Sequence, residues 1–238
     1  MPSHLSSVGF GAADDAALFA LAQRLGPAAD PFDAPAGTYF RARDPHSGAE
    51  LWLQTSADGE QFFGAAPHLG GGSPVPLTLA DRVAPAGDGS PLEGAVRGVA
   101  AGGPLLFDVP DFGRLDQLKL PAAVRVELCG FAHEAEGFAS VEAYRAATDG
   151  ELKPAERSVI PVGLLDEGPA RPLAFVAGVV TASGWRTNRL TGERFGAVVL
   201  DTPLGELLVA LDPAVLADLP PAGGVLAGTV WLSGRVVG

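Results

Sequence analysis

Residues 176–184 (VAGVVTASG) and 226–234 (LAGTVWLSG) share the pattern Ala-Gly-x-Val-x-x-Ser-Gly, and both lie in the last 68 residues of the chain. Their small and β-branched residues are typical of strands. Gly178 and Gly228 fall within these strands, where the missing side chain lets strands bend and cross closely. The repeat therefore predicts a small closed β-barrel in this part of the chain.

Four strands are predicted for this barrel, separated by turn residues. They are Leu173–Ser183, Arg194–Leu200, Glu206–Leu211 and Gly224–Val237. Asp212 and Pro213 offer an N-cap and a first-turn proline, so a short helix to Leu219 is expected between the last two strands. The 32 Gly and 21 Pro of the 238 residues also favour short strands and turns over long helices.

The N-terminal part combines one helix with several strands. Asp14 can cap a helix that ends at Leu25, because leucines recur on one face and Gly26-Pro27 follows. Strands are predicted at residues 4–10, Thr38–Arg43, Glu50–Thr55 and Gln61–Ala65. The predicted order over residues 4–66 is therefore β-α-β-β-β.

The middle of the chain continues in strands and ends in an irregular segment. The predicted elements are strands at Val75–Val83, Ala95–Ala101, Leu105–Val109 and Ala122–Ala132, then a helix from Ser140 to about Thr148. We expect a β-rich α+β protein of two parts. The predicted division is a domain at residues 1–150, a linker at 151–171 and a barrel domain at 172–238.

The chain is acidic, with 28 Asp and Glu against 16 Lys and Arg, a net charge of −12. The excess lies wholly in residues 1–170, since residues 171–238 hold five side chains of each sign. Acidic surfaces repel phosphate backbones and anionic membranes. Nucleic-acid binding is therefore disfavoured, and the C-terminal part is the only place where it fits.

Cys129 is the single cysteine, which excludes an internal disulfide and any multi-cysteine metal site. We expect it to be a buried apolar side chain, because His133 lies about 13 Å further along the same strand. The first ten residues have no signal-peptide character, and no apolar stretch reaches the ~20 residues of a membrane span. These features predict a soluble, cytoplasmic protein.

The sequence lacks several motifs of common enzymes. It contains no Gly-x-Ser-x-Gly, no Walker A loop, no His-Glu-x-x-His and no Gly-x-Gly-x-x-Gly after a strand. Carboxylate pairs occur at Asp108 and Asp111 and at Glu134 and Glu136. We expect these pairs in turns or on solvated faces, where Asp accepts from nearby backbone N–H groups.

The stretch 39–53 (YFRARDPHSGAELWL), with His4 before it, resembles a module of the vicinal oxygen chelate superfamily, which includes glyoxalase and bleomycin-resistance proteins. The resemblance extends over residues 4–66. It implies a βαβββ module and a metal held by a first-strand His and a later Glu. On this chain the implied metal site is His4, Glu50 and His68, although counting from Gly48 places the ligand Glu at Trp52.

Glu50, Trp52 and Gln54 share one face of their predicted strand. If Leu51 and Leu53 pack under the helix, these three side chains point into the open cup of the module. We therefore expect them to bind a ligand, with Trp52 on that face arguing that the metal site is lost.

The last part, residues 172–237, resembles an oligonucleotide/oligosaccharide-binding (OB) barrel in its glycine-bearing first strand and late helix. Cations and aromatic rings gather near one predicted hairpin, at Trp185, Arg186, Asn188 and Arg189. On an OB-like barrel such a group can stack on and hold a single nucleic-acid strand.

The whole chain also resembles an uncharacterised bacterial family. The resemblance rests on residues 3–10 (SHLSSVGF), 107–112 (FDVPDF), 187–192 (TNRLTG) and 228–234 (GTVWLSG). It implies no activity. We expect a non-catalytic binding module for a small molecule or a protein partner, without a cofactor. The alternatives are a glyoxalase-like enzyme with a divalent metal and a barrel that binds single-stranded nucleic acid.

Overall fold

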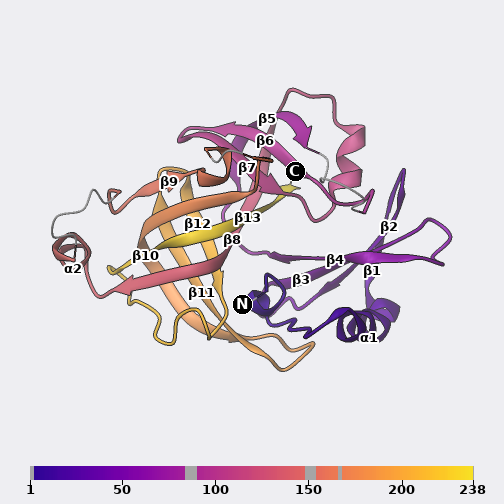
Figure 1. Ribbon diagram of the computed structural model, residues 1–238, viewed down its shortest axis with the longest axis horizontal. Coiled ribbons are helices and arrows are strands. Elements are labelled where there is room, and N and C mark those ends of the chain that lie inside the picture. The colour runs from indigo at the N-terminus through magenta and orange to yellow at the C-terminus, as the bar shows by residue number, and fades with distance from the viewer. Residues whose placement is uncertain (1–2, 84–89, 148–153, 166–167, 238) are drawn as a thin grey trace.

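The computed structural model describes residues 3–83, 90–147, 154–165 and 168–237, and it is rich in β-structure (Figure 1). The strands of these described residues form two sheets. The smaller has four strands in sequence order: β1 (Asp30–Ala34), β2 (Gly37–Arg43), β3 (Ala49–Thr55) and β4 (Phe62–Leu69). The larger has nine strands and includes a closed barrel. The β-rich α+β class predicted from the sequence is confirmed.

The barrel is a ring of five strands. They are β8 (Ala122–Phe138), β10 (Leu173–Thr187), β11 (Arg194–Thr202), β12 (Gly205–Leu211) and β13 (Val225–Val237). Hydrogen bonds join them in the order β10, β11, β12, β8, β13 and back to β10. Only β12 and β8 pair in parallel. Apolar side chains of all five strands, among them Val176, Val198 and Leu232, form the main core.

Three further strands extend from the barrel. They are β5 (Val75–Val83), β6 (Ala95–Ala100) and β7 (Gly103–Asp108). The first pairs with β8, and the last returns to pair in parallel with β13 where Asp108 lies opposite Ser233. This return places the end of β7 beside the middle of β13.

Helix α1 (Asp15–Leu25) covers one face of the four-stranded sheet (Figure 1). The Asp14 side chain accepts a hydrogen bond from the Ala17 N–H at 2.8 Å, as the sequence predicted for the cap. Leu51 and Leu53 of β3 belong to the same buried apolar cluster as the helix leucines. The opposite face of β3 therefore turns towards the barrel and β7.

Two local predictions are wrong, and one strand was missed. Residues 4–10 contain the 3₁₀ helix η1 (Ser6–Val8) instead of a strand, because Gly9 takes a left-handed φ of 70° and closes the turn. The segment from Asp212 to Leu219 forms turns instead of a helix, with Asp212 Oδ1 accepting from the Ala214 N–H. Strand β1 was not predicted, since its sequence, DPFDA, contains Pro and two Asp.

The other predicted elements are present, β5 with the predicted bounds and most others with a different length. β8 continues six residues beyond Ala132, to Phe138. The helix after Ser140 is α2 (Val141–Ala146), and its predicted end at Thr148 lies outside the described residues. Short elements complete the chain: η2 (Gly26–Ala28), η3 (Phe112–Gln117), β9 (Ser158–Ile160) and η4 (Val162–Leu164).

The hydrogen-bonded sheet crosses the predicted linker at residues 151–171. β8 lies before the linker, yet it closes the barrel by pairing with β12 and β13. Within the linker, β9 pairs with β10. The division into two domains stays a prediction, and the barrel takes one of its five strands from residues 1–150.

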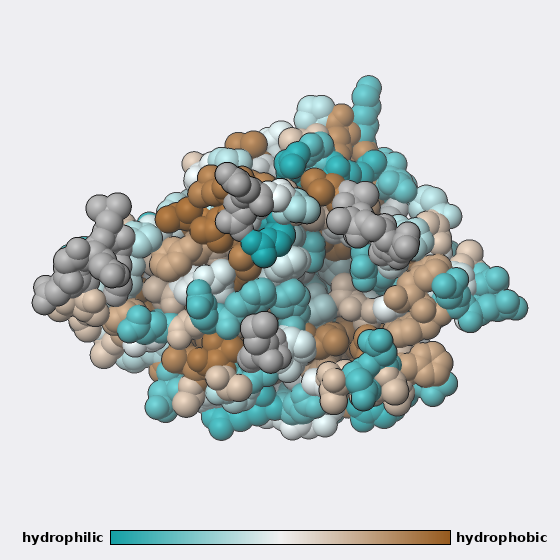
Figure 2. Space-filling view, viewed as in Figure 1, coloured by the Kyte–Doolittle hydropathy of each residue, from teal (hydrophilic) through white to brown (hydrophobic). Residues whose placement is uncertain are grey.

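Neither α-helix among the described residues has the length and apolar character needed to cross a membrane. Hydrophilic and hydrophobic residues are interspersed over the face of the molecule in Figure 2.

Gly228 provides a test of barrel closure. A Cβ at this position would lie 2.1 Å from the Glu134 carbonyl oxygen and 2.8 Å from the Ala135 Cα on the neighbouring β8. Because both are backbone atoms of a paired strand, we expect Gly228→Ala to lower the free energy of unfolding by about 3 kcal/mol in urea denaturation. Gly184→Ala on β10 is the control, since its Cβ meets no atom within 4 Å. Equal stability of the two variants would contradict close strand crossing at Gly228.

Candidate functional site

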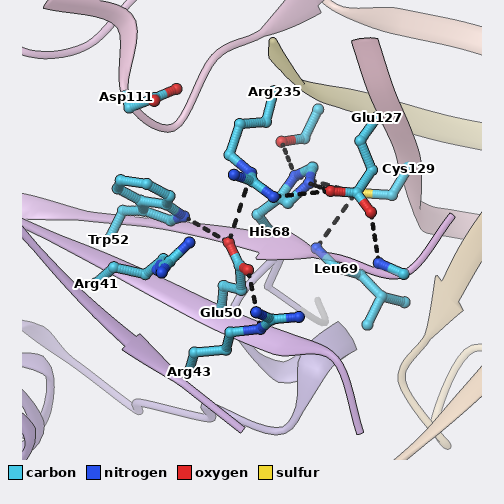
Figure 3. A network of polar contacts seen from close by, with 12 residues as sticks. Arg41, Arg43, Glu50, Trp52, His68, Leu69, Asp111, Glu127, Cys129 and Arg235 are labelled. Atoms are coloured by element: carbon cyan, nitrogen blue, oxygen red, sulfur yellow. Dashed lines mark hydrogen bonds and ion pairs between the residues drawn. The ribbon is translucent and has the colours of Figure 1, made fainter. Parts of the chain in front are cut away.

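Two features lie between the four-stranded sheet and the barrel: a buried ionic network and a cavity. The network is made by β3 and β4 on one side and by β8 and β13 on the other (Figure 3). Glu50 and His68 lie opposite each other on β3 and β4, and neither side chain is exposed. Glu127 on β8 and Arg235 on β13 face them from the barrel.

Arg235 joins the two carboxylates of this network. Its Nη2 lies 2.9 Å from Glu127 Oε2, and its Nε lies 3.9 Å from Glu50 Oε2. Glu50 also accepts a hydrogen bond from Trp52 Nε1 at 3.0 Å and has Arg43 Nε at 3.4 Å. Burial raises the pKa of Glu50, and the surrounding arginines oppose that effect.

His68 and Cys129 sit at the centre of the same network. His68 Nδ1 lies 3.1 Å from Ser233 Oγ and 3.6 Å from Cys129 Sγ, and its Nε2 lies 4.0 Å from Glu127 Oε2. Burial, with Arg235 nearby, lowers the pKa of His68 to about 3, so the ring is neutral and its contact with Glu127 is not an ion pair at pH 7.

Cys129 and His68 have the residue types of a thiol–imidazole pair, but their surroundings do not favour a thiolate. Burial raises the pKa of its thiol to about 12, so the nucleophilic thiolate is not formed at pH 7. Neither Cys129 nor His68 is exposed. The prediction that Cys129 is buried is confirmed, and the group links the two sheets without reaching a substrate.

The second feature is a cavity of about 550 Å³ beside this network. β3, β4, the end of β7 and β13 contribute to its wall. Its polar and aromatic lining residues are His4, Gln54, Glu93, Arg97, Asp108, Arg171 and Trp231. Most of the remaining wall is made of Ala, Val and Pro side chains. A mostly apolar cavity with a few polar groups is the usual form of a small-molecule site.

Gln54 is the most unusual residue of the cavity. Its side chain is not exposed, and neither Oε1 nor Nε2 has a hydrogen-bond partner in the described structure. Gly64 lies opposite it on β4 and supplies no side chain to pair with it. The local sequence therefore leaves a buried and unpaired amide in a residue that borders the cavity.

Asp108 and Trp231 form a fixed pair in the same wall. Trp231 Nε1 donates to Asp108 Oδ2 at 2.6 Å. Burial raises the pKa of Asp108 to about 7, which the tryptophan hydrogen bond only partly offsets. Burial also raises the pKa of Glu93. Both carboxyl groups are thus easier to protonate than they would be in water.

His4 packs against the other side of Trp231, with ring centroids 4.9 Å apart. Its Nε2 lies 2.7 Å from His133 Nε2 on β8, and the two rings are stacked. Burial and the neighbouring His133 lower the pKa of His4 to about 4. The histidine is therefore a neutral ring of the cavity wall at pH 7.

The predicted metal site of His4, Glu50 and His68 is not assembled. Glu50 and His68 lie together, but the His4 ring instead stacks on Phe131 and His133 of β8, and its Nε2 pairs with that of His133. Among the described residues, no three or more His, Cys, Asp or Glu side chains are arranged to hold a metal ion.

The side chains predicted to bind a ligand do lie on one face of β3, but this face is closed to solvent. Glu50, Trp52 and Gln54 share the face as expected, yet none of the three side chains is exposed. Trp52 packs with Tyr39 and Leu92. The open cup is a wrong prediction, because Leu92 and Arg235 cover this face, and of the three residues only Gln54 borders a cavity.

The predicted nucleic-acid group at the β10–β11 hairpin makes internal contacts. Asn188 is buried and donates to the carbonyl oxygens of Val8 and Gly9 at 3.1 and 3.2 Å. Arg186 donates to the Ser47 carbonyl, and the Arg189 N–H donates to Asp44 Oδ2 at 3.0 Å. The hairpin therefore fastens the N-terminal segment and the β2–β3 turn.

Trp185 of the same group is covered by an arginine of the neighbouring strand β11. The Arg194 guanidinium lies 4.3 Å from the centre of the Trp185 ring, so one ring face is already covered. The four residues do not form one open stacking surface.

Sequence reasoning missed Arg235, Glu127, Glu93 and Trp231 as site residues and assigned Asp108 to a turn. Their positions depend on the long β8 and on the parallel return of β7 to β13, both of them contacts between distant segments. Asp108 lies in the motif FDVPDF and Trp231 in the repeat GTVWLSG. The two side chains meet in the structure, but no local periodicity of the sequence connects them.

Removing Arg235 tests the ionic network. Arg235→Met leaves Glu50 and Glu127 buried without their shared cation, so we expect a loss of about 3 kcal/mol in urea denaturation at pH 7. The loss is smaller at pH 5, because Glu50 with its raised pKa then takes up a proton in the folded state. Arg157→Met, in an exposed pair with Asp201, is the control and costs less than about 1 kcal/mol. Equal losses of stability in the two variants would show that Arg235 stabilises the fold no more than an exposed arginine does.

His68 gives a second, pH-dependent test. Its folded pKa of about 3 lies below the usual 6.5, so below pH 6.5 only the unfolded state takes up the proton. Wild-type stability from this group falls as the pH decreases from 6.5, and His68→Asn removes that dependence. The cost of His68→Asn should therefore be about 2 kcal/mol smaller at pH 5 than at pH 7.

The difference between variants is the quantity to measure, because Asp108 with its raised pKa acts in the opposite direction. His46→Asn replaces an exposed histidine outside the network and is the control for the substitution itself. A pH-independent cost of His68→Asn would contradict a neutral buried ring.

Comparison of the chain with protein-family models, with curated proteins and with solved structures found no match. The glyoxalase-like, OB-like and whole-chain bacterial resemblances stay predictions. The residues of the cavity are therefore the basis on which a function is assigned.

Proposed function

We propose that the protein binds a small molecule in the cavity between the four-stranded sheet and the barrel. The observation that carries the proposal is the cavity of about 550 Å³, whose wall is mostly apolar and includes Asp108 and Trp231 fixed by a hydrogen bond of 2.6 Å. A mostly apolar cavity with a few oriented polar groups is the usual form of a small-molecule site. A ligand that enters it buries apolar surface against a wall that is already ordered.

The rest of the wall supports the same proposal. Trp231 and His4 present aromatic surface, and Asp108 holds the tryptophan in one orientation. Most wall residues belong to paired strands, so the cavity exists before a ligand arrives. Binding then requires little ordering of the protein.

The two partial resemblances fit this proposal unequally. The OB-like barrel is supported by a ring of five strands, although β8 comes from outside residues 172–237. The glyoxalase-like module is supported by the helix and the hairpin that follows, and it is weakened by the missing first strand. The cavity lies where these two parts meet, as expected of a ligand site between structural units.

A fragment screen by ligand-observed NMR tests the proposal. We expect fragments that bind the wild-type protein and are displaced or weakened at least tenfold in Ala66→Phe, which fills the cavity from β4. Gln61→Leu, at an exposed position directly before β4, is the control and should bind as the wild type does. The proposal is wrong if no fragment binds, or if Ala66→Phe leaves every fragment bound.

A further inference from the structure

We infer that the ligand is an organic cation, an amine with an apolar body whose protonated nitrogen lies at the carboxylates of Asp108 and Glu93. This inference rests on the proposed function and specifies the class of its ligand. Three features of the cavity carry it: two carboxylates in one wall, the fact that no cation of the described chain is paired with them, and the apolar character of the remaining wall.

The two carboxylates belong to one wall because β6 and β7 pair. Asp108, at the end of β7, lies opposite Ala95 on β6. Glu93 lies two positions before Ala95, and both residues line the cavity with Asp108. The negative charge of Glu93 is one of the causes that raise the pKa of Asp108, so the two groups are close enough to repel each other. A positive charge between them is attracted by both.

Neither carboxylate is compensated by the protein. Among the described residues, no ion pair joins Asp108 or Glu93 to an arginine, lysine or histidine. By contrast, Glu127 and Asp111 each have an arginine nitrogen nearby, at 2.9 and 3.2 Å. A carboxylate that loses water on burial is costly without a counterion. A cation bound in the cavity reduces this cost.

The two arginines of the wall lie too far into solvent to play this part. Arg97 and Arg171 are exposed, and Arg97 lies 3.3 Å from Asp81 on the neighbouring β5. Water and salt screen exposed charges, whereas Asp108 and Glu93 are half-buried. An anionic ligand would meet the carboxylates where screening is weakest. The wall therefore favours a cation over an anion.

The remaining wall favours an apolar body on this cation. Trp231 lines the cavity beside Asp108, and small side chains such as Ala65 and Ala66 leave room for a ring or an aliphatic chain. A volume of about 550 Å³ is far larger than an ammonium group needs. A bare metal ion suits the site less, because no three or more His, Cys, Asp or Glu side chains in the described ranges are arranged to hold one.

Benzylamine, benzyl alcohol and benzoate are matched probes for this inference. They share a phenyl ring and differ in the charge of the polar group, which is positive, neutral and negative in this order. We expect NMR titrations at pH 8 to show benzylamine binding at least tenfold more tightly than benzyl alcohol, because charge-assisted hydrogen bonds are the stronger ones. Benzoate should bind most weakly, because both carboxylates repel it.

Variants connect the preference to the two carboxylates. Asp108→Asn and Glu93→Gln each remove one negative charge and keep the size of the side chain, and an Asn oxygen can still accept from Trp231 Nε1. Each should weaken benzylamine about tenfold and change benzyl alcohol little. Glu60→Gln removes the same charge at an exposed position outside the cavity and is the control. Circular dichroism spectra and melting curves check that the variants are folded.

A pH series gives a readout that a purely structural role of Asp108 would not produce. Burial raises the pKa of Asp108 to about 7, so most of its charge appears between pH 6 and pH 8. Benzylamine stays protonated over this range, and its affinity should rise up to about tenfold with pH. Glu93 has a raised pKa and acts in the same direction, whereas His4, with a pKa of about 4, stays neutral. Arg97 and Arg171 keep their charge. Asp108→Asn should lose most of the rise.

The outcomes separate this inference from the proposed function. Equal binding of benzylamine and benzyl alcohol overturns the cation inference and leaves cavity binding standing, as does a benzylamine affinity that neither Asp108→Asn nor Glu93→Gln lowers. Displacement of benzylamine by an equal concentration of Ca²⁺ would assign the carboxylates to a metal ion and overturn it too. The inference is also overturned if none of the three probes binds while other fragments bind and are displaced by Ala66→Phe. If no fragment of any class binds, the proposed function fails and the inference fails with it.

Discussion

The arrangement of the two sheets depends on one arginine between two buried carboxylates. Arg235 of β13 contacts Glu127 on its own side and Glu50 across the interface, on β3. A buried carboxylate is costly unless a cation and hydrogen bonds compensate it. Glu50 therefore stabilises the contact only when β3 lies against β13, and the ionic network favours one relative position of the two sheets over others.

The long strand β8 makes that position available. It pairs with β5, β12 and β13, and so it connects the N-terminal half of the chain to the barrel. The same strand carries Glu127, Cys129 and His133, which meet partners from β13, β4 and the N-terminal segment. Barrel closure and the docking of the two sheets thus both depend on β8, and the cavity lies between the docked sheets.

The sequence predicted local elements well where periodicity or capping decided them. Asp14 caps the helix as expected, and β5 begins and ends at the predicted residues, Val75 and Val83. Local signals failed where a distant contact decides the structure. Residues 4–10 contain a strand-like pattern, yet they form a turn held by Asn188, which lies about 180 positions further along the chain. The metal site was predicted from the strand that this turn replaces.

The same reasoning explains which site residues could be found. Alternation on β3 placed Glu50, Trp52 and Gln54 on one face, but it could not distinguish their roles. The structure separates them by their partners. Glu50 is compensated by Trp52, Arg43 and Arg235, so its polarity serves the docking of the sheets. Gln54, four residues further along the same face, has no partner and lines a cavity. Glu50 Oε1 also lacks a hydrogen bond, but the Glu50 carboxylate has cations beside it, and the Gln54 amide has no partner of any kind. One strand face therefore serves the docking of the sheets at one end and borders the cavity at the other.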